Sequence, residues 1–412
     1  MTNQPPIEER YRWYMLGLST ITNALVTALP VMCMSVLFKE ISIDLGLTLT
    51  QVGLIWGIGS LPGIVTTLLG GAIGDRFGPQ RVLTLVCLFG GLAGASRGLS
   101  TNAFTLALTV VLFGFVSPMV PMNTIKVTRI WFSSRQLGLA NGVTSMGMAA
   151  GFMLGALISA SVVSPALGGW RNVLFLYGGL AMLLSIPWYF ARPEPAVSPT
   201  GLSTTPTQSI PQMIRAVSRV PNIWFLGWAM LGIGGAIQGT LGYLPLYLRA
   251  IGWEETAADV ASSSFHLVSM ICVIPIALWS DRLGQRRWPL IVMALMIATG
   301  FGLLSVVEGV LVLAAVCLAG MVRDGYMAVF ITMIAESDGI GALAGTATGF
   351  VMIFSGIGNL IAPPIGNSLA EISPSLPFVF WAAMALLGIG GLYAAKDSAA
   401  EEARPVSVKA AA

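Results

Sequence analysis

Two opposite charges stand side by side in a stretch of the chain that is otherwise apolar. Arg323 and Asp324 occur in "MVRDGYMAVF", which follows "VLVLAAVCLAG". An arginine presents a planar fork of donors that suits a carboxylate, sulfonate or phosphate, and an aspartate can hold that arginine or carry a proton. Alternatively, both charges join interhelical pairs that only stabilise the fold. Because adjacent helical residues point about 100° apart, we expect no neat pair between them, and at least one needs a partner elsewhere.

The composition identifies the medium in which these charges lie. Hydrophobic residues make up 55% of the 412 residues, charged residues make up 9%, and the mean hydropathy is +0.82. Soluble proteins carry about 25% charged residues, so the chain is predicted to be an integral membrane protein. The four cysteines lie in apolar stretches without disulfide or metal spacing, and we expect no metal, cofactor or nucleic-acid partner.

The apolar stretches predict twelve membrane-spanning helices, because each crossing needs about 20 apolar residues. Lysine and arginine gather on the side that holds the N-terminus, which places both termini in the cytoplasm and the protein in the inner membrane. The predicted spans are 13–38, 51–72, 82–100, 104–131, 138–164, 171–191, 222–248, 256–280, 288–306, 309–333, 340–366 and 376–395.

A segment rich in proline, serine and threonine separates the sixth span from the seventh. It begins "RPEPAVSPTGLSTTPTQ" and is predicted to be a linker. The predicted parts are a cytoplasmic tail (1–12), a six-helix bundle (13–191), a cytoplasmic linker (192–221), a second six-helix bundle (222–396) and a cytoplasmic tail (397–412).

The two halves share landmarks at one constant offset. "GDRFGPQR" at 74–81 matches "SDRLGQRR" at 280–287, and Gly46 and Gly114 correspond to Gly252 and Gly320. Since each half holds an even number of helices, the two copies have the same orientation, which is a parallel repeat. The equivalents of Arg323 and Asp324 are Ser117 and Pro118, so only the second half carries the charges.

With these paired loops the chain resembles the major facilitator superfamily. The resemblance implies an all-α membrane protein with two pseudo-symmetric six-helix bundles, a conformational latch at the two loops, and a central path lined by helices 1, 4, 7 and 10. The alternative for each loop is a solvated turn. The glycine-rich fifth span, with Gly147, Gly151 and Gly155, indicates close helix packing. The latch residues are Gly71, Asp75, Arg76, Gly78, Arg81, Asp281, Arg282 and Gly284.

Polar residues within the spans are the candidate site residues. His266, the only histidine, suits proton coupling or an anion contact, and a satisfied interhelical histidine is the alternative. Arg97, near the outer end of the third span, is expected to snorkel to the interface rather than bind anions. The candidate proton-coupling residues are Asp324 and His266, and the candidate substrate-binding residues are Arg323, Tyr326, Asn123, Gln238, Tyr243, Asn23 and Thr27.

The sequence favours secondary transport over other functions. It contains no zinc spacing, P-loop or G-x-S-x-G motif, so neither an enzyme nor an ATP-driven pump is expected. We predict a monomeric transporter in the lipid bilayer that moves a small organic anion, such as a carboxylate, by alternating access. Proton symport or anion exchange would drive it. The chain is loosely similar to the oxalate–formate, monocarboxylate and cyanate-type branches. The alternative is efflux of amphipathic drugs or metabolites, which twenty methionines favour.

Overall fold

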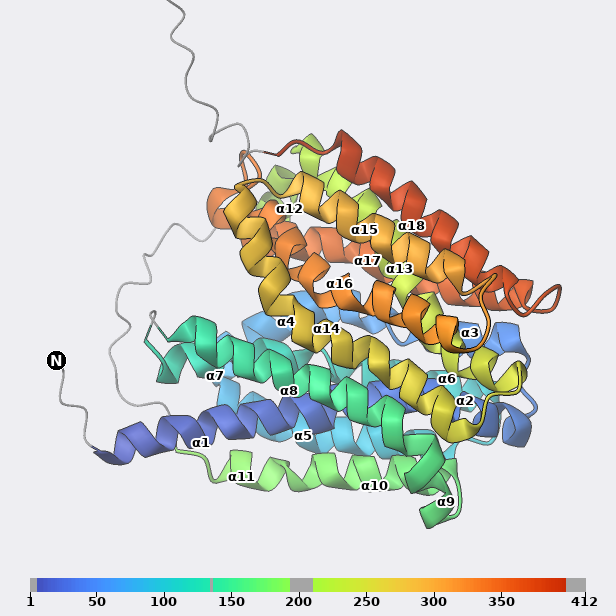
Figure 1. The fold of residues 1–412 in the computed structure, drawn as a ribbon. Helices are drawn as coiled ribbons and strands as arrows, with labels where there is room; N and C mark the ends of the chain where they lie inside the picture. The colour runs from blue at the N-terminus through green and yellow to red at the C-terminus, as the bar shows by residue number, and fades with distance from the viewer. Residues whose placement is uncertain (1–5, 134–135, 193–209, 398–412) are drawn as a thin grey trace, which may run out of the picture.

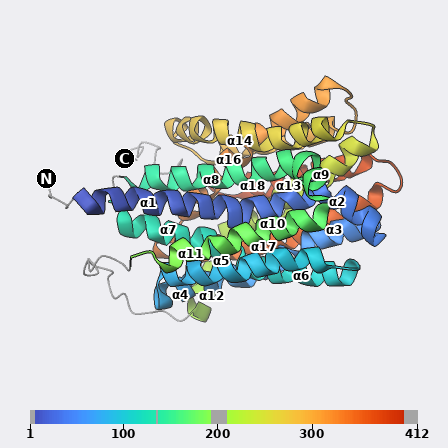
Figure 2. The ribbon, with the colours of Figure 1, turned by 90° about the horizontal axis from the view of Figure 1, so that it is seen from below.

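A computed structural model describes residues 6–133, 136–192 and 210–397, and within these ranges the chain is helical, without strands. Figure 1 shows the helices of the second half stacked above those of the first. Figure 2, seen from below, shows the helices of the first half lying side by side, with α1 alongside α7 and α8. The predicted all-α membrane fold is confirmed.

The first half contains six predicted spans, several of which consist of more than one helical segment. In chain order the segments are α1 (Pro6–Thr22), η1 (Asn23–Ala28), α2 (Leu29–Leu45), α3 (Leu49–Ile58), α4 (Leu61–Phe77), α5 (Pro79–Ser96), η2 (Arg97–Leu99), α6 (Ala103–Val116), α7 (Met119–Trp131), α8 (Leu137–Ile158), η3 (Ser159–Val163), α9 (Ser164–Leu167), α10 (Trp170–Leu183) and α11 (Ser185–Tyr189).

The second half is built from longer and less interrupted helices. They are α12 (Ile210–Ser218), α13 (Pro221–Ala250), α14 (Glu255–Leu283), α15 (Arg287–Leu303), α16 (Val310–Ala335), η4 (Gly341–Leu343), α17 (Ala344–Leu369) and α18 (Leu376–Ala394). The predicted linker lies partly outside the described residues, and its last part forms α12, which bends by 84° into α13.

The helices of the described chain lie where the spans were predicted. Ten helical segments of the described chain are long and apolar enough to cross a membrane, and α12 with α13 makes an eleventh if taken as one bent span. The apolar helix α15, with 17 residues, is slightly shorter than the rest. Each of the twelve predicted ranges falls on one of these segments.

Two spans of the first half are broken near their middles. α3 ends at Ile58 and α4 begins at Leu61, with Pro62 in its first turn; α6 ends at Val116 and α7 follows Pro118. A proline fits the start of a helix because it has no backbone N–H and a fixed φ. The breaks at Gly59–Ser60 and Ser117–Pro118 place small residues with hydroxyl groups within the bundle.

The predicted repeat is visible in the packing of the two halves. A Cβ at Gly114 would lie 2.4 Å from the carbonyl oxygen of Gly59, and a Cβ at Gly320 would lie 2.5 Å from that of Phe265. Gly320 and Phe265 follow Gly114 and Gly59 by the same number of residues that separates the loop at 280–287 from the loop at 74–81. Gly78 and Gly284 in the paired loops both have positive φ values, of 82° and 61°, a conformation that glycine adopts without steric cost.

The two halves meet closely at the end of the molecule formed by the loops 46–48, 251–254 and 370–375, which we call the closed end. There α3 packs on α17, and a Cβ at Gly53 would lie 2.6 Å from the carbonyl oxygen of Pro363. Asn367 donates to the carbonyl oxygen of Leu49 at 3.0 Å. In Figure 1 the two layers diverge toward the opposite end, which carries the paired loops and which we call the latch end.

The glycine-rich helix α8 packs on the first span, as the sequence predicts. A Cβ at Gly147, Gly151 or Gly155 would lie within 2.4–2.9 Å of atoms of Thr20, Ala24 or Leu29. These contacts are with backbone or with short side chains, so larger residues would push the two helices apart.

We predict that Gly320→Ala destabilises the protein, because its Cβ would meet the backbone of α14, which cannot move aside alone. Overpacking of this kind costs about 1–3 kcal/mol, so the thermal midpoint of the purified protein in detergent should fall. Gly179→Ala is the matched control, since a Cβ there meets nothing within 4 Å. Equal midpoints for Gly320→Ala and the wild type would contradict the close packing of α16 on α14.

Candidate functional site

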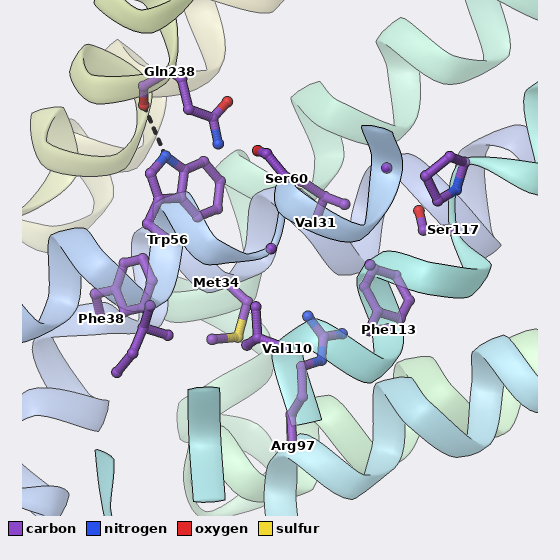
Figure 3. A pocket seen from close by; sticks show the side chains of 15 residues that line it. Val31, Met34, Phe38, Trp56, Ser60, Arg97, Val110, Phe113, Ser117 and Gln238 are labelled. Carbon is purple, nitrogen blue, oxygen red and sulfur yellow. Dashed lines mark hydrogen bonds between the residues drawn. The ribbon is translucent and has the colours of Figure 1, made fainter. Parts of the chain in front are cut away.

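A cavity of about 220 Å³ lies beside the two helix breaks. Side chains of α2, α3, α6, η2 and α13 form its walls, so both halves of the molecule contribute. Figure 3 shows Arg97 entering from one side and Gln238 from the other, with Ser60 between them and Ser117 beside Phe113. Most of the lining is apolar, and a few polar groups converge within it, which is the usual composition of a small-molecule site.

Arg97 supplies the charge in this cavity. Only 2% of the residue is exposed. Its Nε donates to the carbonyl oxygen of Gly94 at 3.1 Å, and its Nη1 donates to that of Pro30 at 2.8 Å. The guanidinium carbon lies 4.4 Å from the centroid of the Phe113 ring. Nη2 is buried and has no hydrogen-bond partner among the described residues.

The charge of Arg97 has no counter-ion in the described part of the chain. None of the ion pairs formed there includes this residue. A buried charge is costly unless it is paired, and two carbonyl dipoles and one aromatic face neutralise it only in part. The arrangement therefore favours an anion bound at Nη2.

The prediction that Arg97 snorkels to the interface is wrong, and the direction of its helix explains why. Side chains on an α-helix tilt toward its N-terminus. The helix α5 runs from the latch end to the closed end, so this tilt points Arg97 back toward the middle of the protein. Gly94 leaves room for the side chain to fold along its own helix, with Nη2 3.6 Å from where a Cβ would stand.

The opposite wall of the cavity joins the two halves. The indole Nε1 of Trp56 in α3 donates to the backbone carbonyl oxygen of Gln238 in α13 at 2.7 Å. The Gln238 side chain itself faces the cavity (Figure 3). The side chains of Gln238, Ser60 and Ser117 have no hydrogen-bond partner among the described residues, so all three are available to a ligand.

A second cavity of about 290 Å³ adjoins the first and shares Ser60 and Gly63 with it. It lies between α4 and α17, and its polar lining includes Ser355 and Asn359. In the orientation that satisfies its hydrogen bonds, the Asn359 amide nitrogen donates to the carbonyl oxygens of Gly234 at 3.1 Å and Ser355 at 3.2 Å.

Of the predicted substrate-binding residues, Gln238 lines the cavity, and those of the first half bond to neighbouring helices or to their own helix. Asn23 donates to the hydroxyl of Thr124 at 3.0 Å, and Thr27 donates to the carbonyl oxygen of Ser117 at 3.3 Å. Both lie in the π-helix η1, a geometry often found at functional sites. Asn123 donates to its own helix, at Met119, and its buried Oδ1 has no partner among the described residues.

The two predicted tyrosines are buried in the second half. The Tyr243 hydroxyl donates to the carbonyl oxygen of Pro374 at 3.1 Å, and its ring lies among Tyr247, Phe378 and Trp381. The Tyr326 ring stacks on that of Phe330, and its buried hydroxyl has no partner within the described residues. Neither tyrosine lines the two cavities described here.

Arg323 and Asp324 pair with each other, so the expectation that neighbours on a helix would not pair is wrong. Arg323 Nη1 lies 2.5 Å from Asp324 Oδ1, because the long arginine side chain bends around the helix to its neighbour. The Arg323 guanidinium lies over the ring of Phe152 in α8, and the Asp324 amide donates to Ser269 of α14 at 3.0 Å. About a quarter of each charged side chain is exposed.

His266 lies in the same region, between α14 and α8. Its ring stacks on Phe152 with centroids 5.4 Å apart, and only 1% of the residue is exposed. Its Nε2 is buried without a hydrogen-bond partner among the described residues. Phe152 therefore contacts both His266 and Arg323, and the two predicted proton-coupling residues, Asp324 and His266, share one cluster.

One predicted latch residue of the second half, Asp281, belongs to a charged network within that half. Asp281 accepts from Arg286 Nη1 at 2.6 Å, and Glu336 at the end of α16 accepts from Arg286 Nε at 3.0 Å. The hydrogen bond to Glu336 raises the pKa of Arg286 above its ordinary value. Arg282 is exposed at the surface.

In the first half, Arg76 is exposed above the ring of Phe77, and Arg81 is also exposed. Gly71 and Asp75 belong to α4, but their surroundings lie outside the described part. The latch role of these loops and its alternative, a solvated turn, therefore stay predictions.

A buried ion pair that sequence reasoning did not find joins the halves at the closed end. Arg249 of α13 pairs with Asp259 of α14, and their side chains are 2% and 0% exposed. Arg249 also donates to the carbonyl oxygen of Val36 in the first half at 3.1 Å. Asp259 accepts from the backbone nitrogen of Ser161, also in the first half, at 3.1 Å. The two charges neutralise each other within the second half, but their hydrogen bonds to Val36 and Ser161 form only while the two halves are together.

The two-bundle architecture, the paired loops and the cavity between the halves agree with a comparison to known sequences. The model of the Major Facilitator Superfamily matches residues 18–337 and 248–411. The chain belongs to the major facilitator superfamily.

Superfamily relatives of this chain include several transporters. It is 22% identical over 378 residues to the probable sulfoacetate transporter SauU of Cupriavidus necator, with 85% of each chain covered. It is 27% identical over 323 residues to the probable nitrate/nitrite antiporter NarK1 of Thermus thermophilus, covering 73% of this chain and 67% of that one. These relatives are transporters and not enzymes.

Solved structures of transporters share the fold. The crystal structure of a D-xylose-proton symporter matches with a TM-score of 0.77 at 13% identity, covering 94% of this chain and 99% of that one. A bacterial homologue of the lysosomal transporter Spinster, in an inward-facing and unoccupied conformation, matches with a TM-score of 0.73 at 16% identity and 95% coverage of both chains. At these identities the similarity establishes the fold alone.

We predict that Asp259→Ala opens the closed end, because it leaves Arg249 as an uncompensated buried charge, at a cost of about 3–5 kcal/mol. Spin labels at Lys39 and Glu255, which pair across the halves at this end, would report the change. In a background without native cysteines, the distance distribution of Asp259→Ala should gain a longer component.

Asp44→Ala is the matched control for this experiment, because the exposed Arg171–Asp44 pair lies within the first half. Its distance distribution should equal that of the wild type. An unchanged distribution in Asp259→Ala as well would show that the buried pair does not hold the halves together.

Proposed function

We propose that this protein is a secondary active transporter that carries a small organic anion across the inner membrane by alternating access. The observation that carries the proposal is the buried guanidinium of Arg97, which faces a cavity between the halves with Nη2 unpartnered and without a carboxylate beside it among the described residues. An arginine fork suits carboxylate and sulfonate groups, and an anion would complete its neutralisation.

The relatives support an anionic substrate. The names of the two relatives described above refer to sulfoacetate and to nitrate or nitrite, which are anions. The alternative of drug efflux fits less well, because a cationic amphipathic drug would meet the positive charge of Arg97. Within the described lining of the two cavities no carboxylate attracts a cation.

The conformation fits one state of an alternating-access cycle. With both termini in the cytoplasm, as the charge distribution favours, the closed end would face outward and the cavity would be reached from the cytoplasm. Opening outward then requires breaking the contact between Trp56 and Gln238 and the contacts that the Arg249–Asp259 pair makes across the halves. The paired loops at the latch end would come together in the same step.

Gln238 connects the substrate to this change. Its side chain faces the cavity, and its backbone carbonyl accepts from Trp56 across the halves. An anion held by Arg97 in the first half and touched by Gln238 in the second would favour the arrangement that keeps both groups close. A substrate shifts a conformational equilibrium only by such differences in contact between the two states.

The charged cluster at α8, α14 and α16 is our proposed coupling site. Asp324 binds Arg323 when ionised, so taking up a proton would release the arginine and change the contact with Phe152 of the first half. His266, which stacks on the same ring, is the second candidate for the proton. Proton symport is therefore the favoured driving mode, and anion exchange is the alternative.

We expect Arg97→Gln to abolish anion binding. In a thermal-shift screen of the purified protein against small carboxylates and sulfonates, a ligand should raise the midpoint of the wild type, since binding to the folded state stabilises it. The shift should be lost in Arg97→Gln and kept in Arg171→Gln, which removes an arginine that pairs at the surface.

Arg323→Ala is the comparison that locates the site. A shift lost in Arg323→Ala but kept in Arg97→Gln would move the anion to the α16 cluster. Stabilisation by cationic drugs alone, or full uptake by Arg97→Gln, would overturn the proposed function.

For the coupling site, the measurement is the pH dependence of uptake in proteoliposomes. Proton symport predicts faster uptake by the wild type as the external pH falls. Asp324→Asn cannot exchange a proton, so this dependence should flatten, and His266→Gln should flatten it if histidine is the carrier. Profiles like that of the wild type in both variants would remove these residues as proton carriers.

A further inference from the structure

The two adjoining cavities differ in their electrostatic character. Among the described residues that line them, Arg97 is the only ionisable side chain, and it lies in the first cavity. The polar groups of the second cavity are neutral: Ser60, Ser355 and Asn359. A ligand that occupies both would therefore meet a positive charge at one end and neutral hydrogen-bonding groups at the other.

One positive charge suits one negative charge. Arg97 uses the N–H of Nε and one N–H of Nη1 within the protein and leaves Nη2 without a partner, so a single carboxylate or sulfonate can bind at Nη2 and neutralise the charge. A second anionic group would enter the neutral cavity, where no described lining residue carries a positive charge. Burying an unpaired charge is strongly unfavourable, so a dianion fits poorly.

At the neutral end, the side chains of Asn359 and Ser60 can form hydrogen bonds with a ligand. The Asn359 amide nitrogen is occupied by the carbonyl oxygens of Gly234 and Ser355, which leaves its carbonyl oxygen as an acceptor. The Ser60 hydroxyl has no hydrogen-bond partner among the described residues and can donate or accept. A hydroxyl group on the ligand can donate to Asn359 and accept from Ser60 together.

The ligand can reach both ends because the cavities share Ser60 and Gly63. A side chain at position 63 would stand close to Pro118, since a Cβ there would lie 3.6 Å from its Cγ. A side chain at position 63, which lines both cavities, would therefore take up space beside Pro118.

We propose that the substrate is a monoanion with a hydroxyl or similar neutral group at the end opposite its charge, and that Ser60 and Asn359 recognise this neutral end. The proposal rests on the proposed function, because it needs the anionic end at Arg97. It assigns substrate selection to the second cavity, which belongs in part to the second half of the molecule.

A set of four-carbon ligands tests the proposal on the wild-type protein. Butyrate has one charge, 4-hydroxybutyrate adds the terminal hydroxyl, and succinate replaces it with a second charge at neutral pH. Measured by calorimetry or thermal shift, 4-hydroxybutyrate should bind more tightly than butyrate by at least roughly three- to tenfold, the effect of a single hydrogen bond, because its hydroxyl has two partners. Succinate should bind more weakly than butyrate.

Two variants separate the neutral end from the charged end. Ser60→Ala should reduce the preference for 4-hydroxybutyrate over butyrate, because it removes one of the two partners of the ligand hydroxyl, whereas Arg97→Gln should lose binding of both ligands. Ser368→Ala, at a hydroxyl outside both cavities that bonds within its own helix, should change neither. The Ser60 side chain makes no hydrogen bond within the described fold, so Ser60→Ala should remain folded.

The outcomes distinguish a failure of the proposed neutral end from a failure of the proposed anion site at Arg97. Equal binding of butyrate and 4-hydroxybutyrate by the wild type, or tighter binding of succinate than of either, would overturn the inference and leave the anion site at Arg97 in place. Binding of neither monoanion by the wild type, or undiminished binding by Arg97→Gln, would overturn the proposed function and the inference with it.

Discussion

A positive charge buried in an apolar bundle without a carboxylate beside it constrains the rest of this structure. Arg97 is held by two backbone carbonyl oxygens and one aromatic ring, and its Nη2 is left over. The glycine at position 94 gives the side chain its path, and the breaks in the second and fourth spans supply the polar lining opposite it. Each of these features has a clear physical role if an anion completes the charge balance, and a cost without evident benefit if none does.

Arg97, Arg249 and Arg323 all lie within the described helical bundle, and their partners differ. Arg249 is paired with Asp259 and joins the halves at the closed end, so its charge is used in the contact between them. Arg323 is paired with its own neighbour, so its availability depends on the state of Asp324. Arg97 has no such partner among the described residues. A buried charge is energetically costly, so we assign each arginine a separate role. Arg249 holds the closed end together, Arg323 belongs to the coupling site, and Arg97 binds the anion.

The fold can be predicted from the sequence because it depends on properties that are averaged over long segments of the chain. Span length, charge distribution and the repeat of 74–81 at 280–287 are properties of whole segments, and the bilayer restricts the outcome to helices. The structure confirms the repeat in detail, since Gly114 and Gly320 make equivalent contacts with Gly59 and Phe265.

The sequence predicts the site less well than the fold, because the site depends on the direction in which single side chains point. The sequence identified Gln238 and the charges of the α16 cluster, but it assigned Arg97 to the interface and kept Arg323 and Asp324 apart. Hydropathy does not report that a helix tilts its side chains toward its N-terminus, or that an arginine can bend to its neighbour. The signal that could have identified Arg97 is its place one turn after Gly94 and two turns after Gly90, which continues a buried small-residue face of α5. The Arg249–Asp259 pair gave no such signal, because its partners come from both halves.

The most direct test of the anion site is to locate an anion in crystals of the protein. Crystals grown in sodium bromide and measured at the bromine absorption edge would show bound bromide as anomalous density. The account predicts a peak in the cavity lined by Ser117 and Gln238, within hydrogen-bonding distance of Arg97 Nη2. A cavity without a peak, together with a peak beside Arg323, would contradict it.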